Sequence, residues 1–258
     1  MPDASTPTAS TPTTEVKPPA ADSVLYFIST VDGDGALNYE TVNGSWINYW
    51  LSFPFELGGT RYFTGFAWQT PDKYTQEQKD APAAPETKVT LSDATFVMGD
   101  ANSKTPWKLQ GSEPFIGEFG GFEKADEVDP KRKLQTWVTP SGDMLLAVPT
   151  WYLVSGTTMR TIQILLFNPH SLEGTDDKRW RYLATLEAGS SNDGSCGPDE
   201  PGNIACVDTT GTLTFTNAPG SDLPVLTVSL AGTGAGAGDS TTEYRYDPAH
   251  TTYRSTSR

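Results

Sequence analysis

Apolar and polar residues alternate over most of this chain, and the apolar runs are short. A period of two is typical of strands with one buried face, and Gly, Pro and Asn turn signals separate the runs. We expect strands at residues 24–31, 45–55, 60–68, 88–98, 134–138, 144–154, 160–167, 181–187, 212–215, 225–230 and 242–246. The pattern predicts an all-β protein.

One segment carries helix signals instead. Thr70 is a candidate cap and Pro71 suits the first helical turn, so residues 70–79 are predicted to form a short helix. The Pro-rich residues 81–85 end it. Residues 99–133 alternate less clearly, and we expect them to be less regular.

The 258 residues are compatible with one large domain, because all-β folds often reach this size as a single unit. We expect a multi-stranded antiparallel domain over residues 22–258. A sandwich, a barrel and a short propeller-like arrangement are all compatible with the pattern.

Residues 1–21 are almost wholly Pro, Thr, Ala and Ser, which bury little, so they are predicted to be a disordered linker. Such a spacer resembles the mature N-terminus of bacterial lipoproteins. This implies an exported protein, with a lipid anchor as its link to a membrane.

Cys196 and Cys206 flank a Gly- and Pro-rich stretch. A zinc site would need further ligands close by, whereas His170 and His250 are single and far apart in the sequence. The spacing predicts a disulfide and hence an oxidising compartment, the periplasm or the outer membrane.

The charge balance excludes some functions. The chain has 18 Lys and Arg against 32 Asp and Glu, a formal net charge of −14. This acidity argues against binding nucleic acid through its phosphates. No apolar run approaches the roughly 18 residues of a membrane helix.

Motifs for catalysis are missing from the sequence. It has no Gly-x-Ser-x-Gly elbow, no His-Glu-x-x-His pair and no phosphate-binding loop. His170 and His250 lie in Pro-containing, turn-like stretches, and we interpret both as solvated loop residues. We therefore expect a protein that is not an enzyme.

An acidic cluster lies in the Gly-rich middle of the chain. Its members are Glu113, Glu118, Glu123, Asp126, Glu127 and Asp129. Glycoside hydrolysis needs two carboxylates at a suitable separation, but nothing in this spacing selects a pair. We expect a solvated acidic loop, and these six residues are our candidates for contacting a partner.

Calcium is the one cofactor for which we consider candidate ligands in the sequence. Asp32 and Asp34 supply oxygen ligands, but Ala36 stands where a third ligand would be needed. Asp34-Gly35 is also a common turn pair. We interpret the segment as a turn without metal and expect no cofactor, with Asp32 and Asp34 as weak calcium candidates.

Aromatic residues are dense between positions 46 and 68. Strict alternation would place Trp46 and Trp50 on one face of a strand and Tyr49, Phe53 and Phe55 on the other. Both faces would then be apolar, as in a central sandwich strand, so we expect core residues. The alternative is a platform for binding carbohydrate.

The C-terminal fifty residues resemble the closing segment of small exported Gram-negative proteins. The resemblance lies in Gly211-Thr-Leu-Thr-Phe215, Asp222-Leu-Pro-Val-Leu-Thr-Val228, Gly232-Thr233, Tyr244-Arg-Tyr-Asp247 and Tyr253-Arg254. The proteins concerned are periplasmic lysozyme inhibitors and secretion-system immunity lipoproteins. The chain departs from them at residues 216–221, where the inhibitors carry an acidic calcium loop, and no functional residue is carried over.

Two functional hypotheses follow. The first is a periplasmic immunity or inhibitor protein that blocks a toxic hydrolase with a basic cleft, because an acidic protein is steered to a basic surface. The second is a surface domain that binds or hydrolyses glycans through the aromatic face and the acidic loop. A structural envelope lipoprotein is a third alternative.

Overall fold

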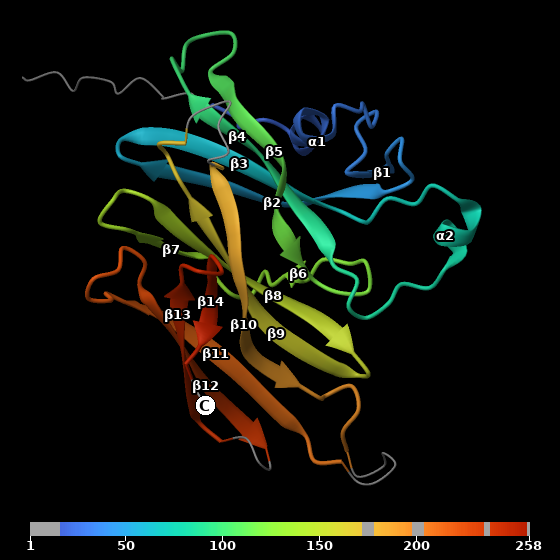
Figure 1. Cartoon of the computed structure of the whole chain (residues 1–258), viewed down its shortest axis with the longest axis vertical. Coiled ribbons are helices and arrows are strands. Elements are labelled where there is room, and N and C mark those ends of the chain that lie inside the picture. The colour runs from blue at the N-terminus through green and yellow to red at the C-terminus, as the bar shows by residue number, and fades with distance from the viewer. Residues whose placement is uncertain (1–15, 172–177, 198–203, 235–237, 257–258) are drawn as a thin grey trace, which may run out of the picture.

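The computed structural model describes residues 16–171, 178–197, 204–234 and 238–256, which form two antiparallel sheets (Figure 1). The small sheet contains, in spatial order, β1 (Asn38–Glu40), β2 (Trp46–Leu57), β3 (Thr60–Gln69), β4 (Val89–Met98) and β5 (Trp107–Phe119). Neighbours in the sequence are thus neighbours in the sheet. The prediction of an all-β fold is confirmed.

The large sheet follows the same rule over the second half of the chain. Its spatial order is β14 (Thr252–Ser255), β13 (Ser240–Asp247), β12 (Val225–Gly234), β11 (Val207–Thr216), β10 (Trp180–Ser191), β9 (Thr157–Phe167), β8 (Met144–Val154) and β6 (Glu127–Val128). A further strand, β7 (Gln135–Val138), also pairs with β8. Antiparallel neighbours need no crossover connection, so the chain can pass directly from one strand to the next.

The two sheets share a core. One face of β8–β10 packs against the inner face of the small sheet, and Trp180 at the start of β10 is fully buried between them. Its ring lies 5.0 Å from the rings of Phe66 on β3 and Phe167 on β9, measured between centroids. The two sheets therefore bury one continuous apolar layer.

The large sheet curls on itself around a second core, which joins side chains of β8–β10 with those of β11–β14. Trp137 on β7 stacks on Phe215 of β11, with ring centroids 5.8 Å apart. At the far edge, the hydroxyl of Thr252 donates a hydrogen bond to the Leu183 carbonyl of β10. The large sheet thus has a core of its own beside the core that it shares with the small sheet.

The prediction of a strand at residues 24–31 is wrong, because this segment forms helix α1 (Ala21–Ser29). Its buried residues Val24, Leu25 and Ile28 lie on one helical face that covers the outer face of the small sheet. Gly65 of β3 leaves room for Val24: a Cβ there would lie 2.6 Å from Val24 Cγ1. A short apolar run fits either element, and here the exposed sheet face decides.

The predicted helix at residues 70–79 is confirmed only at its end, as α2 (Gln76–Asp80). Thr75, rather than Thr70, caps it. The backbone N–H of Gln78 donates to Thr75 Oγ1 over 3.2 Å, and the backbone N–H of Thr75 donates to Gln78 Oε1 over 3.1 Å. This reciprocal capping box fixes the first turn. No helix in the part of the chain that the structure describes is long and apolar enough to cross a membrane.

The expectation of a less regular segment at residues 99–133 is wrong for residues 107–119, which form β5, whereas most of its other residues lie outside strands. Gly, Pro and charged residues along β5 weaken the alternation, and its pairing with β4 contains two register shifts. As the last strand of the small sheet, β5 has one unpaired edge, where such residues are tolerated.

A register shift in β2 corrects the predicted faces of the aromatic residues. The pairing with β3 skips Trp50, so Trp50 turns to the same inner core as Phe53 and Phe55. Tyr49 packs toward the α1 side, and Trp46 is exposed. The core interpretation is confirmed for Trp50, Phe53 and Phe55, although strict alternation is wrong there.

The disulfide between Cys196 and Cys206 is confirmed, with the two Cα atoms 5.0 Å apart. It closes the connection between β10 and β11. Both histidines, His170 and His250, are exposed in turns, as expected.

β5 and β10 bring the sheets into direct contact at Gly117. A Cβ added there would lie 2.4 Å from Tyr182 Cβ, closer than folded proteins allow. A glycine is thus required where the two backbones approach.

We expect G117A to lower the free energy of unfolding by about 1–3 kcal/mol, because the added methyl group forces the sheets apart. G111A on the same strand is the matched control, since a Cβ at Gly111 meets no atom within 4 Å. Urea unfolding measures both. Equal stabilities for the two variants would contradict the close approach.

Candidate functional site

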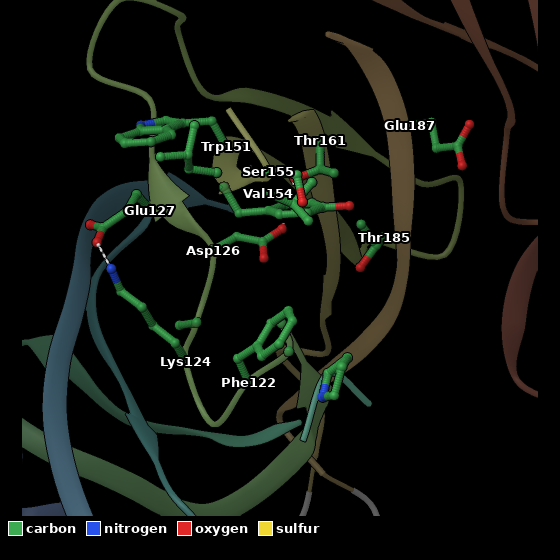
Figure 2. A pocket seen from close by; sticks show the side chains of 16 residues that line it. Phe122, Lys124, Asp126, Glu127, Trp151, Val154, Ser155, Thr161, Thr185 and Glu187 are labelled. Carbon is green, nitrogen blue, oxygen red and sulfur yellow. Dashed lines mark hydrogen bonds and ion pairs between the residues drawn. The ribbon is translucent and has the colours of Figure 1, made fainter. Parts of the chain in front are cut away.

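A pocket of about 990 Å³ opens between the β5–β6 connection, the β8–β9 hairpin and β10 (Figure 2). Its wall combines the aromatic side chains Phe122, Trp151 and Tyr152 with polar groups that include Asp126 and Thr185. We call it the Asp126 pocket. Large, partly apolar pockets with a few converging polar groups are the usual sites for small ligands.

Asp126 lies in the wall of this pocket with only 5% of its surface exposed. The hydroxyl of Thr161 donates to Asp126 Oδ2 over 2.8 Å, and the Gln163 amide donates to the same oxygen over 2.9 Å. Both donors belong to β9. Burial raises the pKa of the Asp126 carboxyl, and these two hydrogen bonds oppose the increase.

The donors toward Asp126 are oriented by a chain of hydrogen bonds. The second N–H of the Gln163 amide donates to Thr150 Oγ1 over 2.9 Å. The Thr150 hydroxyl lies 2.6 Å from that of Thr161, so Thr150 donates to Thr161, which keeps its own proton for Asp126. Gln163 Oε1 accepts hydrogen bonds from the hydroxyls of Tyr182 and Thr185, and these two bonds fix the orientation of the side-chain amide.

The backbone of the Asp126 segment is also fixed. The Trp50 indole N–H donates to the Asp126 carbonyl over 2.9 Å, and Ala125 belongs to the core between the sheets. The side chain can therefore neither swing away nor lose its donors without disturbing β2 and β9. Figure 2 shows the carboxyl group pointing into the pocket.

Phe122 stands opposite Asp126 on a strained turn. Phe122 and Glu123 have φ angles of 53° and 55°, and the Lys124 amide donates to the Gly121 carbonyl over 3.0 Å. Two central residues with positive φ define a turn that normally needs Asn or Gly. A bulky residue here costs on the order of 1–3 kcal/mol, and such strain clusters at functional sites.

The surrounding chain holds this turn in place. The Phe122 and Glu123 amides donate to the carbonyls of Pro85 and Thr87, over 3.3 and 2.8 Å. The Glu123 carboxylate lies 2.6 Å from the Lys73 ammonium group. Phe122 as a residue is 53% exposed, and it lies at the pocket wall.

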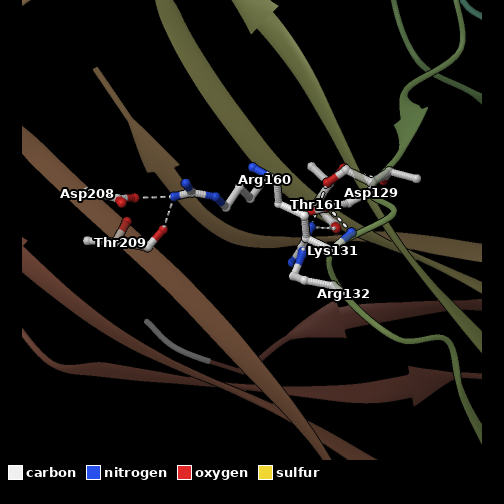
Figure 3. Close-up of polar contacts among 8 residues, drawn as sticks. Asp129, Lys131, Arg132, Arg160, Thr161, Asp208 and Thr209 are labelled. Carbon is white, nitrogen blue, oxygen red and sulfur yellow. Dashed lines mark hydrogen bonds and ion pairs between the residues drawn. The ribbon is translucent and has the colours of Figure 1, made fainter. Parts of the chain in front are cut away.

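Asp129 does not line the pocket, but it holds Arg132, which binds the two strands β8 and β9. Its carboxylate pairs with Arg132 over 2.9 Å, and Arg132 also donates to the carbonyls of Thr150 and Thr161 over 2.7 and 3.1 Å (Figure 3). In the same view, Arg160 of β9 reaches Asp208 and the Thr209 carbonyl of β11. Both arginines fix the strand that carries the donors to Asp126.

Glu113 belongs to a different polar cluster, between the sheets. Its carboxylate accepts the backbone amides of Arg179 and Trp180 over 2.6 and 3.4 Å. Its register partner Asp93 is 1% exposed, and Asp93 Oδ1 has no hydrogen-bond partner among the described residues. Burial and the charge of Glu113 raise the pKa of Asp93. The hydrogen bond from Thr95 and the positive charge of Arg179 act in the opposite direction and lower it.

The six predicted partner-binding acids therefore do not form one patch. Asp126 and Glu127 line the Asp126 pocket, and Glu113 binds the start of β10. Asp129 pairs with Arg132, three residues further along the chain. Glu127 and Glu123 form ion pairs with lysines, and Glu118 is exposed on β5.

Asp32 and Asp34, the weak calcium candidates, lie in a tight turn after α1. The Asp34 amide donates to Asp32 Oδ1 over 2.9 Å. Across the described ranges, no three His, Cys, Asp or Glu side chains gather closely enough to hold a metal ion.

Sequence reasoning missed most of the pocket. Lining residues that it did not name include Phe122, Trp151, Tyr152, Thr161, Thr185 and Glu187, and it also missed Gln163, which donates to Asp126. One signal was available: Thr161 and Gln163 are polar positions beside the apolar run of β9, and a buried Gln needs partners. The aromatic side chains come from turns and hairpins that only the fold brings together.

Comparison of the chain with protein-family models, with curated proteins and with solved structures finds no match.

We expect D93N to raise the free energy of unfolding at pH 7 by about 1–2 kcal/mol, because an amide removes the charge that burial at this position makes unfavourable. The folded state binds the Asp93 proton more tightly than the unfolded chain, because the pKa is raised. Wild-type stability therefore falls as pH rises through this raised pKa, and the D93N advantage should vanish near pH 3. Urea unfolding from pH 3 to 8 measures this, with exposed E118Q as control. An advantage that persists at pH 3 would rule out this origin.

For F122N we expect unchanged stability or a gain of up to about 1 kcal/mol, since Asn tolerates positive φ. F115N is the matched control: Phe115 on β5 is similarly exposed, at 46%, and has an ordinary strand conformation. Thermal unfolding compares the two. A loss as large in F122N as in F115N would show that the turn stores no strain.

Proposed function

We propose that the protein is a binding protein that holds a small organic ligand in the Asp126 pocket. The observation that carries the proposal is a cavity of about 990 Å³ whose wall contains a buried, oriented carboxyl group. This volume lies at the upper end of the range for drug-sized ligands. A purely structural envelope protein would have no need for such a cavity.

The walls favour an organic molecule over a bare ion. Phe122, Trp151 and Tyr152 supply apolar and aromatic surface, and Leu153 and Val154 continue it along the β8–β9 hairpin. Exposed rings in a concave site lose water favourably when a ligand covers them. The polar groups are few and lie close to Asp126, where they would orient the ligand.

The hypothesis of an immunity or inhibitor protein for a toxic hydrolase stays a prediction. Its support is the net charge of −14, whereas most of its candidate acids are engaged within the fold. The glycan-binding alternative gains more from the Asp126 pocket, which combines aromatic rings with carboxylates. We infer an oxidising, exported setting from the disulfide.

The neutral fluorescent dye N-phenyl-1-naphthylamine tests the pocket as a binding site. We expect wild-type protein to bind one dye molecule, and T185W to weaken binding at least about tenfold, because an indole would fill the space beside Asp126. T212W, an exposed Thr of β11 outside the pocket, is the matched control. Fluorescence titration measures both. Equal dye affinity in T185W and T212W would refute binding in this pocket.

A further inference from the structure

The Asp126 pocket has an unbalanced charge. Its ionisable wall residues are Lys124, Asp126, Glu127, Tyr152 and Glu187. Lys124 and Glu127 neutralise each other in an ion pair of 2.8 Å. Asp126 and Glu187 remain, so the wall presents two negative charges when both carboxylates are ionised.

We propose that the pocket selects a ligand with one cationic nitrogen, an ammonium group, attached to an apolar ring. The nitrogen would contact Asp126, and the ring would lie against Phe122, Trp151 and Tyr152. This inference rests on the proposed function and adds the chemical class of the ligand.

The hydrogen bonds at Asp126 leave one place for such a nitrogen. Thr161 and Gln163 both donate to Oδ2, and no described residue donates to Oδ1. An ionised carboxylate only accepts hydrogen bonds, so the ligand must supply a donor at Oδ1. A charged N–H donor forms the stronger bond to it.

The oriented network reinforces this preference. Gln163 cannot flip to present its carbonyl to Asp126, because Oε1 is held by the hydroxyls of Tyr182 and Thr185. Thr161 is likewise committed as a donor through Thr150. Both side chains that contact the Asp126 carboxylate are therefore donors, and they stabilise its negative form.

The aromatic side chains provide the other half of the site. Phe122 and Tyr152 are 53% and 39% exposed at the pocket wall, and Phe122 is kept there at the expense of backbone strain. Ring faces attract cations, and the attraction grows where water is excluded. Burial raises the pKa of the Tyr152 hydroxyl, and the negative charges of Asp126 and Glu187 raise it further. All three side chains line the same pocket.

A charge series with one ring tests the inference: benzylammonium, benzyl alcohol and benzoate, measured by saturation-transfer NMR titration at low ionic strength. We expect benzylammonium to bind at least about tenfold more tightly than benzyl alcohol, and benzoate to bind least. D126N should reduce benzylammonium affinity about tenfold and leave benzyl alcohol unchanged. The amide oxygen in D126N still accepts from Thr161 and Gln163, so the fold is expected to persist.

E118Q is the matched control, because it removes the same charge from an exposed position outside the pocket and should change affinity less than about twofold. If D126N does not fold, E187Q supplies the second test and should weaken benzylammonium severalfold. Equal affinities for the three compounds, or an equal loss in D126N and E118Q, would overturn the inference.

The dye titration distinguishes a failure of this inference from a failure of the proposed function. If the dye binds but benzylammonium does not bind preferentially, the pocket is a ligand site without charge selection. If methyl glucoside binds more tightly than benzylammonium, the glycan-binding alternative replaces the inference. If neither the dye nor any compound binds, both proposals fail.

Discussion

The packing of Trp180 between the two sheets is the contact on which the rest of the structure depends. The indole is fully buried, so its N–H needs acceptors, and the hydroxyls of Thr64 and Thr95 on the small sheet lie 3.1 Å away. Glu113 from the same sheet accepts the backbone amides where β10 begins. An aromatic ring of this size removes roughly 150–250 Å² from water, while the polar contacts fix its depth and register. The Asp126 pocket lies where the connection that leaves β5 passes the β8–β9 hairpin, beside this junction of the two sheets.

Two buried carboxyl clusters lie along this junction, and they differ in one respect. Asp93 is buried and Glu113 half-buried, and Glu113 joins the small sheet to the start of β10 by accepting the backbone amides of Arg179 and Trp180. Asp126 is equally buried but forms part of a cavity wall. Its partners use one oxygen and leave the other facing the pocket. The same chemistry thus supports the fold at one place and offers a binding group at the other.

The structural roles of the acidic segment show why spacing alone misled. Residues 113–129 run from an edge strand through a strained turn into the large sheet, so neighbouring acids meet different surroundings. Glu123 finds Lys73, Asp129 finds Arg132, and Asp126 is covered by Trp50 and β9. Lys73, Trp50 and β9 are distant in sequence from the acids that they contact, whereas Arg132 lies only three residues after Asp129. A count of carboxylates cannot anticipate such pairings, because most of them are set by long-range contacts.

The sequence by itself determined the all-β class, most strand positions in the second half of the chain, and the disulfide, because alternation and loop spacing act locally. It named Asp126 without distinguishing it from its neighbours. Only the tertiary structure decided that residues 21–29 form a helix, since the outer face of the small sheet needed a cover. It also decided which aromatic rings stay exposed and which carboxyl group faces a cavity. These properties depend on how the two sheets meet, and no local pattern encodes that contact.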